Sequence, residues 1–446
     1  MKIEPSLRHG LTNNVSIASN MSTDKTDAGA SRSILTSKAM WVLMFISALN
    51  FLDRQVINIL AEPIKRELGL SDTQLGLMTG LAFAIFYSSL GIPIARFADR
   101  PHTNRAKIIA VSLAIWSAMT AACGLAQNFG QLLLARLCVG IGEAGCTPSA
   151  HSLISDLFPP AQRAAALAFY GIGMSLGLLV GLGAGGMIAD AIGWRWTLLL
   201  LGLPGLLLSL IAWSVLPEPR QLAGDLRTGP ARYGFLITAR DIFRLPVYRN
   251  IVAALTVASF LTYGASAWQA IFLMRSYGLS IAVAGITLGI IGGIGTGIGT
   301  WIGGYLAQRA ARKGSHHVLT GCLVALLLAF PLSVAGYLAP DWRVCAVLLF
   351  VAGLSAGMLY APTFTCVQGI VPPSSRAAAT ALLLMIQNLI GLGAGPALFG
   401  LGSDLLAPHV GRESVRWILV ASTFFLPLSA WLYWRAGKGL AAGTRD

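Results

Sequence analysis

The strongest constraint in this sequence is a series of long apolar stretches, each close to the length that crosses a lipid bilayer. A spanning helix needs about 20 predominantly apolar residues. The chain is 55% hydrophobic and 11% charged, whereas soluble domains carry about 25% charged residues. This composition excludes a water-soluble protein and predicts an all-α membrane protein with twelve transmembrane helices. We place them at residues 39–61, 73–95, 107–126, 129–152, 164–189, 195–216, 248–274, 281–306, 317–338, 343–367, 377–402 and 416–435.

The basic residues indicate which side of the membrane each connection occupies. Connections after the even-numbered spans hold fifteen Lys and Arg residues, and those after the odd-numbered spans hold seven. Because Lys and Arg concentrate in cytoplasmic loops, we expect both termini in the cytoplasm, with a disordered tail at 1–37 and a short tail at 437–446. The net charge of +14 is then a topology signal, and we expect no nucleic-acid partner.

Two sequence echoes divide the chain into related halves. "FPPAQRAAALAFY" begins at Phe158 and "VPPSSRAAATALL" at Val371, so the shared PPxxRAAA signature recurs after 213 residues. "ARFADR", ending at Arg100, is echoed by "GYLAQR", ending at Arg309. Both echoes keep the same span order and membrane side, as in transporters built from parallel repeats. The sequence predicts two pseudo-symmetric six-helix bundles, at 38–216 and 246–436, joined by a cytoplasmic linker at 217–245.

Several motifs imitate enzyme sites but lie inside predicted spans. G-x-S-x-G at 173–177 requires a strand-to-helix turn, and G-x-G-x-x-G at 140–145 and 181–186 requires a βαβ unit. We therefore predict no catalytic residue, no metal site and no cofactor. Glycines that recur every fourth residue, at 173–185 and 285–293, instead favour close packing between helices.

Four charged residues lie within the predicted membrane interior. Asp53 and Arg54 belong to the first span, where Asn50 shares their face, and Arg136 and Glu143 belong to the fourth. Arg136 and Glu143 are two helical turns apart and face the same way. Ionisable residues inside a membrane commonly mark ion or substrate paths. The alternative is a set of buried ion pairs that fixes the helix register.

The second half has no counterpart to these charges. At the repeat offset, Arg136 corresponds to Leu349 and Glu143 to Ala356. A cavity charged on only one wall suits an amphiphile, whose phosphate or carboxylate head a guanidinium can hold bidentately. The second half offers aromatic and neutral polar candidates for the other wall, namely Tyr263, Trp268, Gln269, Tyr360 and Gln368.

The number of spans and the loop motifs carry a family resemblance. Twelve spans in two parallel halves, with "GIPIARFADR" between spans 2 and 3, resemble the major facilitator superfamily. The resemblance implies a cytoplasmic gate at Asp99 and Arg100, although Pro101 to Arg105 replace the usual Gly-Arg-Arg. Within the superfamily, "NFLDRQ" and "GIGEAGCTPSAHSLISDLFPP" are similar to the Spinster lipid transporters.

The Spinster resemblance implies proton-coupled movement of a lysophospholipid-like or sphingoid-phosphate amphiphile by alternating access. It assigns proton coupling to Asp53 and Glu143, with Arg54 and Arg136 as charge partners. We expect protons as the coupling ion, and a monomer surrounded by membrane lipids in a bacterial inner membrane. Two alternatives keep the same fold: an exporter of a soluble organic anion or drug, and an uncoupled lipid facilitator or scramblase.

Overall fold

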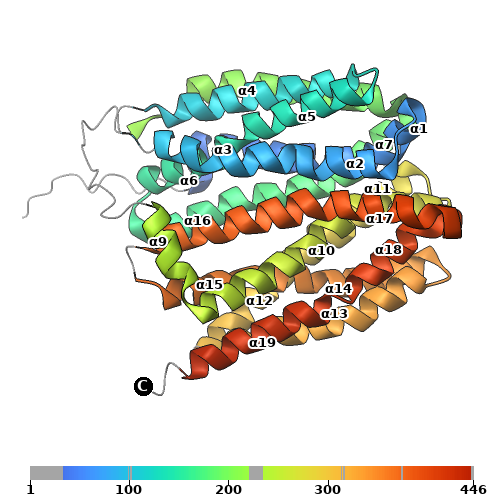
Figure 1. Ribbon diagram of the computed structural model, residues 1–446. Helices are drawn as coiled ribbons and strands as arrows, with labels where there is room; N and C mark the ends of the chain where they lie inside the picture. The colour runs from blue at the N-terminus through green and yellow to red at the C-terminus, as the bar shows by residue number, and fades with distance from the viewer. Residues whose placement is uncertain are drawn as a thin grey trace, which may run out of the picture.

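The protein is a bundle of long helices that run side by side (Figure 1). The computed structural model describes residues 34–98, 100, 103–219, 235–312, 314, 317–372 and 375–442. Ten helical stretches among them are long and apolar enough to cross a membrane, and two of these, Ala165–Val215 and Ala378–Ala441, have 51 and 64 residues. Each of those two is interrupted near its middle and makes two crossings. The predicted all-α fold with twelve transmembrane helices is confirmed.

The first six crossings form one bundle, coloured blue to green in Figure 1. The fifth and sixth crossings share α7, which is broken at Gly193, where φ is 81°. Glycine adopts a positive φ without the steric cost of a Cβ, so the chain reverses there as the sequence predicts. The elements are α1 (Lys38–Leu68), α2 (Asp72–Gly76), the π-helical turn η2 (Leu77–Leu81), α3 (Ala82–Ala98), α4 (Arg105–Gly124), α5 (Phe129–Ala144), α6 (Cys146–Leu157) and α7 (Pro160–Val215).

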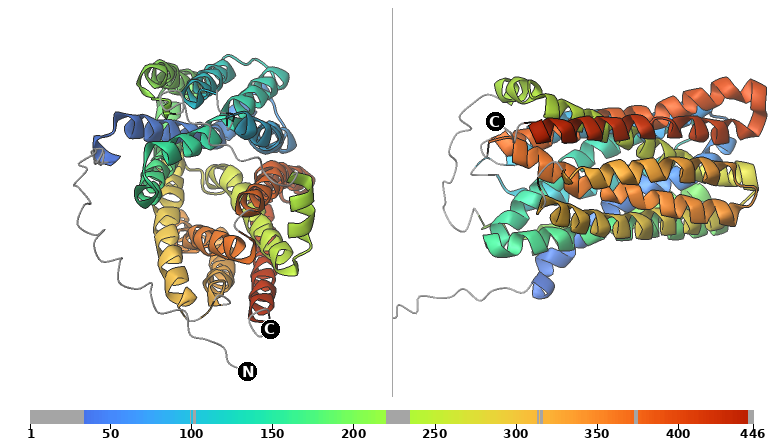
Figure 2. Two further views of the ribbon diagram at one scale, coloured as in Figure 1. Left: turned by 90° about the vertical axis from the view of Figure 1, so that its left-hand side faces the viewer. Right: turned by 90° about the horizontal axis from the view of Figure 1, so that it is seen from below.

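The last six crossings form a second bundle beside the first. Figure 2, left, looks along the helices and shows the blue-to-green bundle above the yellow-to-red one. The elements are α10 (Pro246–Tyr277), α11 (Ile281–Gly289), the π-helical turn η3 (Ile290–Gly295), α12 (Thr296–Ala311), α13 (Thr320–Leu338), α14 (Trp342–Met358), α15 (Tyr360–Ile370), α16 (Arg376–Ile386), the π-helical turn η6 (Gln387–Ala394), α17 (Gly395–Val410), α18 (Ser414–Thr423) and α19 (Leu426–Ala442).

The start of α1 and the end of α19 lie at the same end of the bundle (Figure 2, right), which we call the terminal side; the other end is the opposite side. On the terminal side, the predicted linker at 217–245 contains a helix, α9 (Phe235–Phe243), while its residues 220–234 lie outside the described residues. The last helix runs six residues beyond the predicted bundle boundary at 436. Of the predicted N-terminal tail, residues 1–33 also lie outside the described residues.

The first helix extends well beyond its predicted end at residue 61. α1 continues to Leu68 and ends at Gly69, which has φ of 66°. Its last two turns are charged, and Glu62 accepts from Arg66 Nε at 3.1 Å, one turn further on. A hydropathy pattern ends where charges begin, whereas the helix continues because those charges pair along its surface.

Candidate functional site

Four charged side chains meet in the interior of the first bundle. α1 contributes Asp53 and Arg54, and α5 contributes Arg136 and Glu143. Asp53, Arg136 and Glu143 are 4%, 2% and 0% exposed. Residues seven apart on an α-helix lie on one face, so Arg136 and Glu143 both reach α1. These four side chains are the charge cluster.

The charges pair between helices rather than along them. Arg54 Nε donates to Glu143 Oε2 at 2.7 Å, and Arg136 Nη1 donates to Asp53 Oδ2 at 3.4 Å. Adjacent residues on a helix point about 100° apart, which turns Asp53 and Arg54 toward different partners. The acid–base doublet of the sequence is therefore shared between two ion pairs.

Neutral groups complete part of the cluster. Asn50 Nδ2 donates to Glu143 Oε2 at 2.8 Å, and the Thr120 hydroxyl donates to Asp53 Oδ1. Glu143 Oε1 and Arg136 Nε have no hydrogen-bond partner in the described part of the chain. Thr120 is not predictable from the sequence, because a single threonine in the apolar α4 segment carries no signal of its own. The cluster therefore retains hydrogen-bonding capacity for a proton or a ligand.

Arg54 is the accessible cation of the cluster. Its side chain is 13% exposed, while that of its partner Glu143 is fully buried. The guanidinium carbon lies 4.4 Å from the centre of the Tyr87 ring and 4.8 Å from that of Phe83. Aromatic faces attract a guanidinium and hold its plane in place. An anion that approaches the cluster meets this oriented group first.

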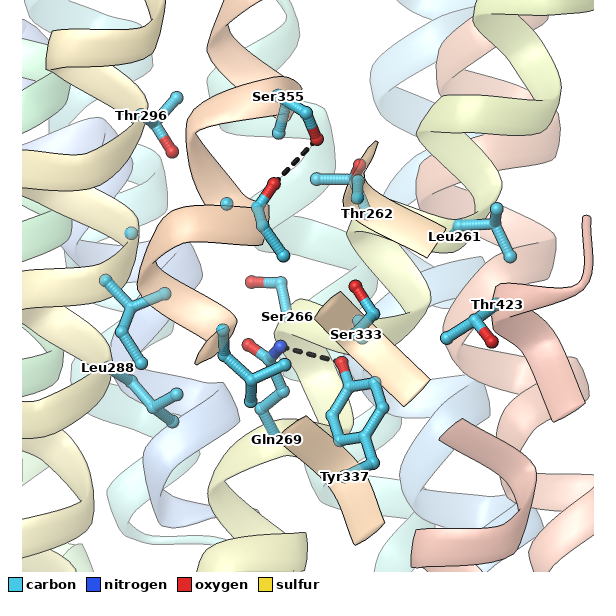
Figure 3. Close-up of a pocket in the computed structure, with 18 of the residues that line it drawn as sticks. Leu261, Thr262, Ser266, Gln269, Leu288, Thr296, Ser333, Tyr337, Ser355 and Thr423 are labelled. Carbon is cyan, nitrogen blue, oxygen red and sulfur yellow. Dashed lines mark hydrogen bonds between the residues drawn. The ribbon is translucent and has the colours of Figure 1, made fainter. Parts of the chain in front are cut away.

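A cavity of about 180 Å³ lies between α7 of the first bundle and the helices of the second (Figure 3). Leu178 and Leu182 of α7 form part of its wall, and the second bundle supplies the rest. None of the described residues that line it is charged. Nine are polar: Thr262, Ser266, Gln269, Thr296, Ser333, Tyr337, Ser355, Ser422 and Thr423.

The internal repeat relates this cavity to the charge cluster. Leu349 and Ala356, the counterparts of Arg136 and Glu143, both line the cavity. A side-chain contact also connects the two regions, since Ser266 Oγ donates to Gln55 Oε1 at 3.3 Å. The candidate site thus has a charged half in the first bundle and an uncharged polar half in the second.

Of the predicted second-half residues, Gln269 lines the cavity, and its Nε2 donates to the Tyr337 hydroxyl at 2.9 Å. The predicted residue Trp268 does not line this cavity. Trp268 is 1% exposed, and its indole N–H donates to the Pro396 carbonyl at 2.9 Å, between α10 and α17. One step along a helix turns a side chain by about 100°, enough to place Trp268 in the packing beside the site.

The other predicted residues lie around the cavity rather than in its wall. Tyr263 packs against the hydrophobic core of the first bundle, and the Tyr360 hydroxyl accepts from Gln387 Nε2 at 3.0 Å. Gln368 is exposed near the end of α15 and does not line this cavity. In the predicted gate, Asp99 lies outside the described residues, and Arg100 lies 5.5 Å from the Phe97 ring.

The glycines of the crossing formed by α11, η3 and α12 pack against α7, and we call this contact the glycine seam. It shows on which side the two bundles are closed against each other. A methyl group built on Gly285 would lie 2.2 Å from the Leu182 carbonyl oxygen. At Gly289 and Gly293, the nearest atom would be 3.2 Å away, and at Gly297 it would be 3.9 Å away. The helices touch near the opposite side and separate toward the terminal side. The predicted close packing of this glycine stripe is confirmed, and it lies between the bundles.

A network of charged groups also joins the bundles on the opposite side. Arg275 Nη2 of α10 lies 2.8 Å from Glu62 Oε2 and 2.7 Å from Asp72 Oδ1. Asp404 of α17 accepts the backbone N–H groups of Asp72 at 3.0 Å and Thr73 at 2.7 Å. A carboxylate there satisfies N–H groups that have no partner within their own helix. We call Glu62, Asp72, Arg275 and Asp404 the interbundle clasp.

Comparisons with known proteins agree with this architecture. The family model described as Major Facilitator Superfamily matches residues 43–396. An MFS-type efflux pump of Mycolicibacterium smegmatis is 31% identical over 400 residues, covering 89% of this chain and 92% of the relative. Protein spinster homolog 1 of Xenopus laevis is 27% identical, covering 81% and 72%.

A solved structure is similar over nearly the whole chain. It is a bacterial homologue of the human lysosomal transporter Spinster in an inward-facing, unoccupied conformation. The two chains are 32% identical with a TM-score of 0.80, and the match covers 91% of this chain and 97% of the other.

Proposed function

The chain belongs to the Major Facilitator Superfamily, and from that premise we propose that it is a proton-coupled secondary transporter of an anionic amphiphile. The cargo class is a lysophospholipid or sphingoid phosphate, moved by alternating access of the two bundles. The setting is a bacterial inner membrane, with a monomer whose termini lie in the cytoplasm. The similarity to Spinster proteins supports the family resemblance of the sequence motifs, and that resemblance implies the cargo class.

The observation that carries this proposal is the contact between accessible Arg54 and buried Glu143. Both ligand and carboxylate are anions, so they compete for one guanidinium. Protonation of Glu143 removes its charge and weakens its attraction to Arg54. The freed guanidinium then binds the anionic head in the bidentate manner that Arg favours. Loss of the proton reverses the exchange and releases the cargo, which couples proton binding to cargo binding.

The test is lysolipid flux in liposomes that contain the purified protein, with and without a pH gradient. We expect flux to follow the gradient, and Glu143→Gln to reduce gradient-driven flux at least about tenfold, because one pair interaction of about 1.4 kcal/mol already corresponds to a factor of ten. Glu67→Gln is the matched control, because Glu67 is about half exposed and pairs with Arg195 outside the cluster.

Three outcomes separate the competing interpretations. Flux that ignores the pH gradient in both proteins identifies an uncoupled facilitator or scramblase. A lower melting temperature of Glu143→Gln with unchanged flux assigns the cluster to helix register alone. Flux coupled to the gradient and sensitive to Glu143 supports the proposal.

The polar lining of the cavity favours one second candidate, a soluble organic anion or drug whose uncharged polar part lies in the cavity. The name of the mycolicibacterial relative, an MFS-type efflux pump, is compatible with such a cargo. The two cargo classes differ in the apolar tail, so thermal stabilisation distinguishes them. We expect lysolipids to raise the melting temperature, and sugar phosphates and short carboxylates to leave it unchanged; the reverse pattern would favour the soluble anion.

A further inference from the structure

We propose that the uncharged cavity binds hydroxyl groups on the head of the cargo. The protein would then prefer anionic lysolipids with a hydroxyl-rich head over lipids of equal charge and tail that lack those hydroxyls. This inference rests on the proposed function and specifies its cargo. It depends on the cavity wall, whereas the proposed function depends on the charge cluster.

The wall selects against charged groups. No lining residue in the described part of the chain carries a charge, so an ammonium or carboxylate placed there would be buried without an opposite charge, which is costly. Leu349 and Ala356 stand where the first half has Arg136 and Glu143. The second bundle therefore has a cavity at the positions that correspond to the charge cluster of the first bundle. Neutral residues stand there in place of the charged ones.

The wall is also rich in hydrogen-bond acceptors. A Ser or Thr hydroxyl has one proton to donate and two lone pairs. Four cavity hydroxyls donate that proton to a backbone carbonyl of their own helix. Only their lone pairs then remain, so these hydroxyls can accept a hydrogen bond from a ligand. The donations run from Thr262 to Ala258 at 2.9 Å, Ser355 to Ala352 at 2.6 Å, Ser422 to Leu419 at 2.7 Å and Thr423 to Val420 at 2.7 Å.

One further pair completes the polar wall. The side-chain amide N–H of Gln269 donates to the Tyr337 hydroxyl oxygen. The proton of that hydroxyl therefore remains available for a hydrogen bond to a ligand. In the view of Figure 3, Ser266 and Ser333 lie between this pair and Ser355. A ligand here meets mostly acceptors and a donor at Tyr337. Hydroxyl groups, which both donate and accept, satisfy such a wall without adding charge.

The position of the cavity assigns both halves of the site to one head group. Gln55 follows the anion-binding candidate Arg54 in the chain and contacts Ser266 in the cavity wall. In this proposal, a head whose phosphate binds Arg54 extends past Gln55, so that its hydroxyls reach the wall at Ser266. The same chemistry could come from a soluble polyol phosphate, so the test includes a compound without a tail.

The experiment measures binding of three probes to the full-length protein in detergent by calorimetry. Lysophosphatidylglycerol and lysophosphatidylpropanol share charge and tail and differ in the hydroxyls of the head, and glycerophosphoglycerol keeps the hydroxyls without the tail. We expect wild type to bind the glycerol lipid at least about fivefold more tightly than the propyl lipid, the effect of one hydrogen bond. We expect the compound without a tail to bind much more weakly.

Matched variants locate the preference. Thr262→Val removes a cavity hydroxyl, and Thr365→Val removes an exposed hydroxyl that donates to its own helix in the same way. We expect Thr262→Val and Tyr337→Phe to reduce the preference for the glycerol lipid several-fold without changing propyl-lipid binding. Thr365→Val should behave as wild type.

Each remaining outcome overturns a specific claim. Equal binding of the two lipids by wild type overturns the hydroxyl subsite and leaves the proposed function standing. Variants that weaken both lipids equally do the same, since they indicate a general packing defect. Binding of neither lipid overturns both claims. Tight binding of glycerophosphoglycerol would show that the cavity binds a soluble polyol phosphate rather than a lipid head group.

Discussion

At the scale of single residues, the two oxygens of Glu143 have different environments. Oε2 accepts from both Arg54 and Asn50, whereas Oε1 has no partner among the described residues. Asp53 is different, because Thr120 donates to one of its oxygens and Arg136 to the other. A proton can therefore bind Glu143 without displacing an existing hydrogen bond, and on this difference we propose that Glu143 is the first proton acceptor.

This ordering gives a prediction for the two acids. Glu143→Gln should make lysolipid affinity independent of pH between pH 5 and 8, because glutamine mimics the protonated acid. Asp53→Asn should keep a pH-dependent affinity, although about tenfold weaker overall, since Arg136 loses a charge partner worth about 1.4 kcal/mol. Calorimetric titrations at several pH values measure both. A pH-independent Asp53→Asn beside a pH-dependent Glu143→Gln would reverse the assignment.

Trp268 gives a second prediction at this scale. Trp268→Phe loses the hydrogen bond to Pro396 and leaves a small void between α10 and α17. We expect the free energy of unfolding to fall by about 2 kcal/mol, with lysolipid affinity unchanged. Denaturation and binding assays measure these two quantities. Trp196→Phe is the control, because Trp196 is 62% exposed; a loss of affinity in Trp268→Phe would restore a binding role.

The sequence identifies the charged residues but not their partners. Asp53 and Arg54 stand out because charges are rare in apolar spans. Their pairing with Arg136 and Glu143 depends on how α1 rotates against α5, and no spacing within one helix reports that rotation. Gln269 and Trp268 show the same limit, because sequence cannot tell which of two neighbours on α10 faces the cavity.

At the scale of helices, the interbundle clasp holds the opposite side closed. Asp404 accepts N–H groups at the start of α2, and an anion at a helix N-terminus is stabilised by the helix dipole. We expect Asp404→Asn to weaken this contact by about 1 kcal/mol and to raise the population of the state that opens on the opposite side.

Distances between spin labels on the full-length protein test this expectation. Labels at Leu125 and Arg412 report the separation of the bundles on the opposite side, and both positions are exposed. Asp404→Asn should broaden their distance distribution toward longer values. Asp341→Asn is the matched control, because Asp341 caps α14 within one bundle. An unchanged distribution in Asp404→Asn would show that the clasp contributes nothing to closure.

The glycine seam gives a second prediction at the helix scale. Gly285→Ala places a methyl group 2.2 Å from the Leu182 carbonyl, whereas the same change at Gly304 meets no atom within 4 Å. We expect Gly285→Ala to disfavour closure and lower the melting temperature by several degrees, since overpacking costs about 1–3 kcal/mol. Gly304→Ala should change the melting temperature little. Equal melting temperatures would mean that the seam relaxes without cost.

Sequence patterns recover the helices better than their ends and their contacts. Apolar length predicts the crossings, but the charged end of α1 and the nine-residue helix α9 are not apolar stretches of spanning length. The clasp joins Asp72 to Asp404 across 332 positions, and each residue alone resembles an ordinary polar loop residue. The pseudo-repeat shows where the halves correspond, yet the cavity around Leu349 and Ala356 emerges only when six helices pack.

At the scale of the whole molecule, the distribution of basic residues predicts orientation. Fifteen Lys and Arg residues lie in the connections on the terminal side, against seven on the other, and this bias predicts that the terminal side faces the cytoplasm. Reporter fusions at the C-terminus and after Leu125 test this prediction in bacterial cells. The C-terminal fusion should be active only with a cytoplasmic reporter and the Leu125 fusion only with a periplasmic one; the reverse result would invert the topology.

The even pairing of the charge cluster has an electrical consequence. Two carboxylates and two guanidiniums sum to zero, and moving one uncompensated charge through a potential of 100 mV involves about 2.3 kcal/mol. A carrier with a balanced interior can return empty without working against the membrane voltage. A cargo bearing one negative charge and accompanied by one proton keeps that balance. The proposed cycle therefore draws its driving force from proton concentration and produces no current.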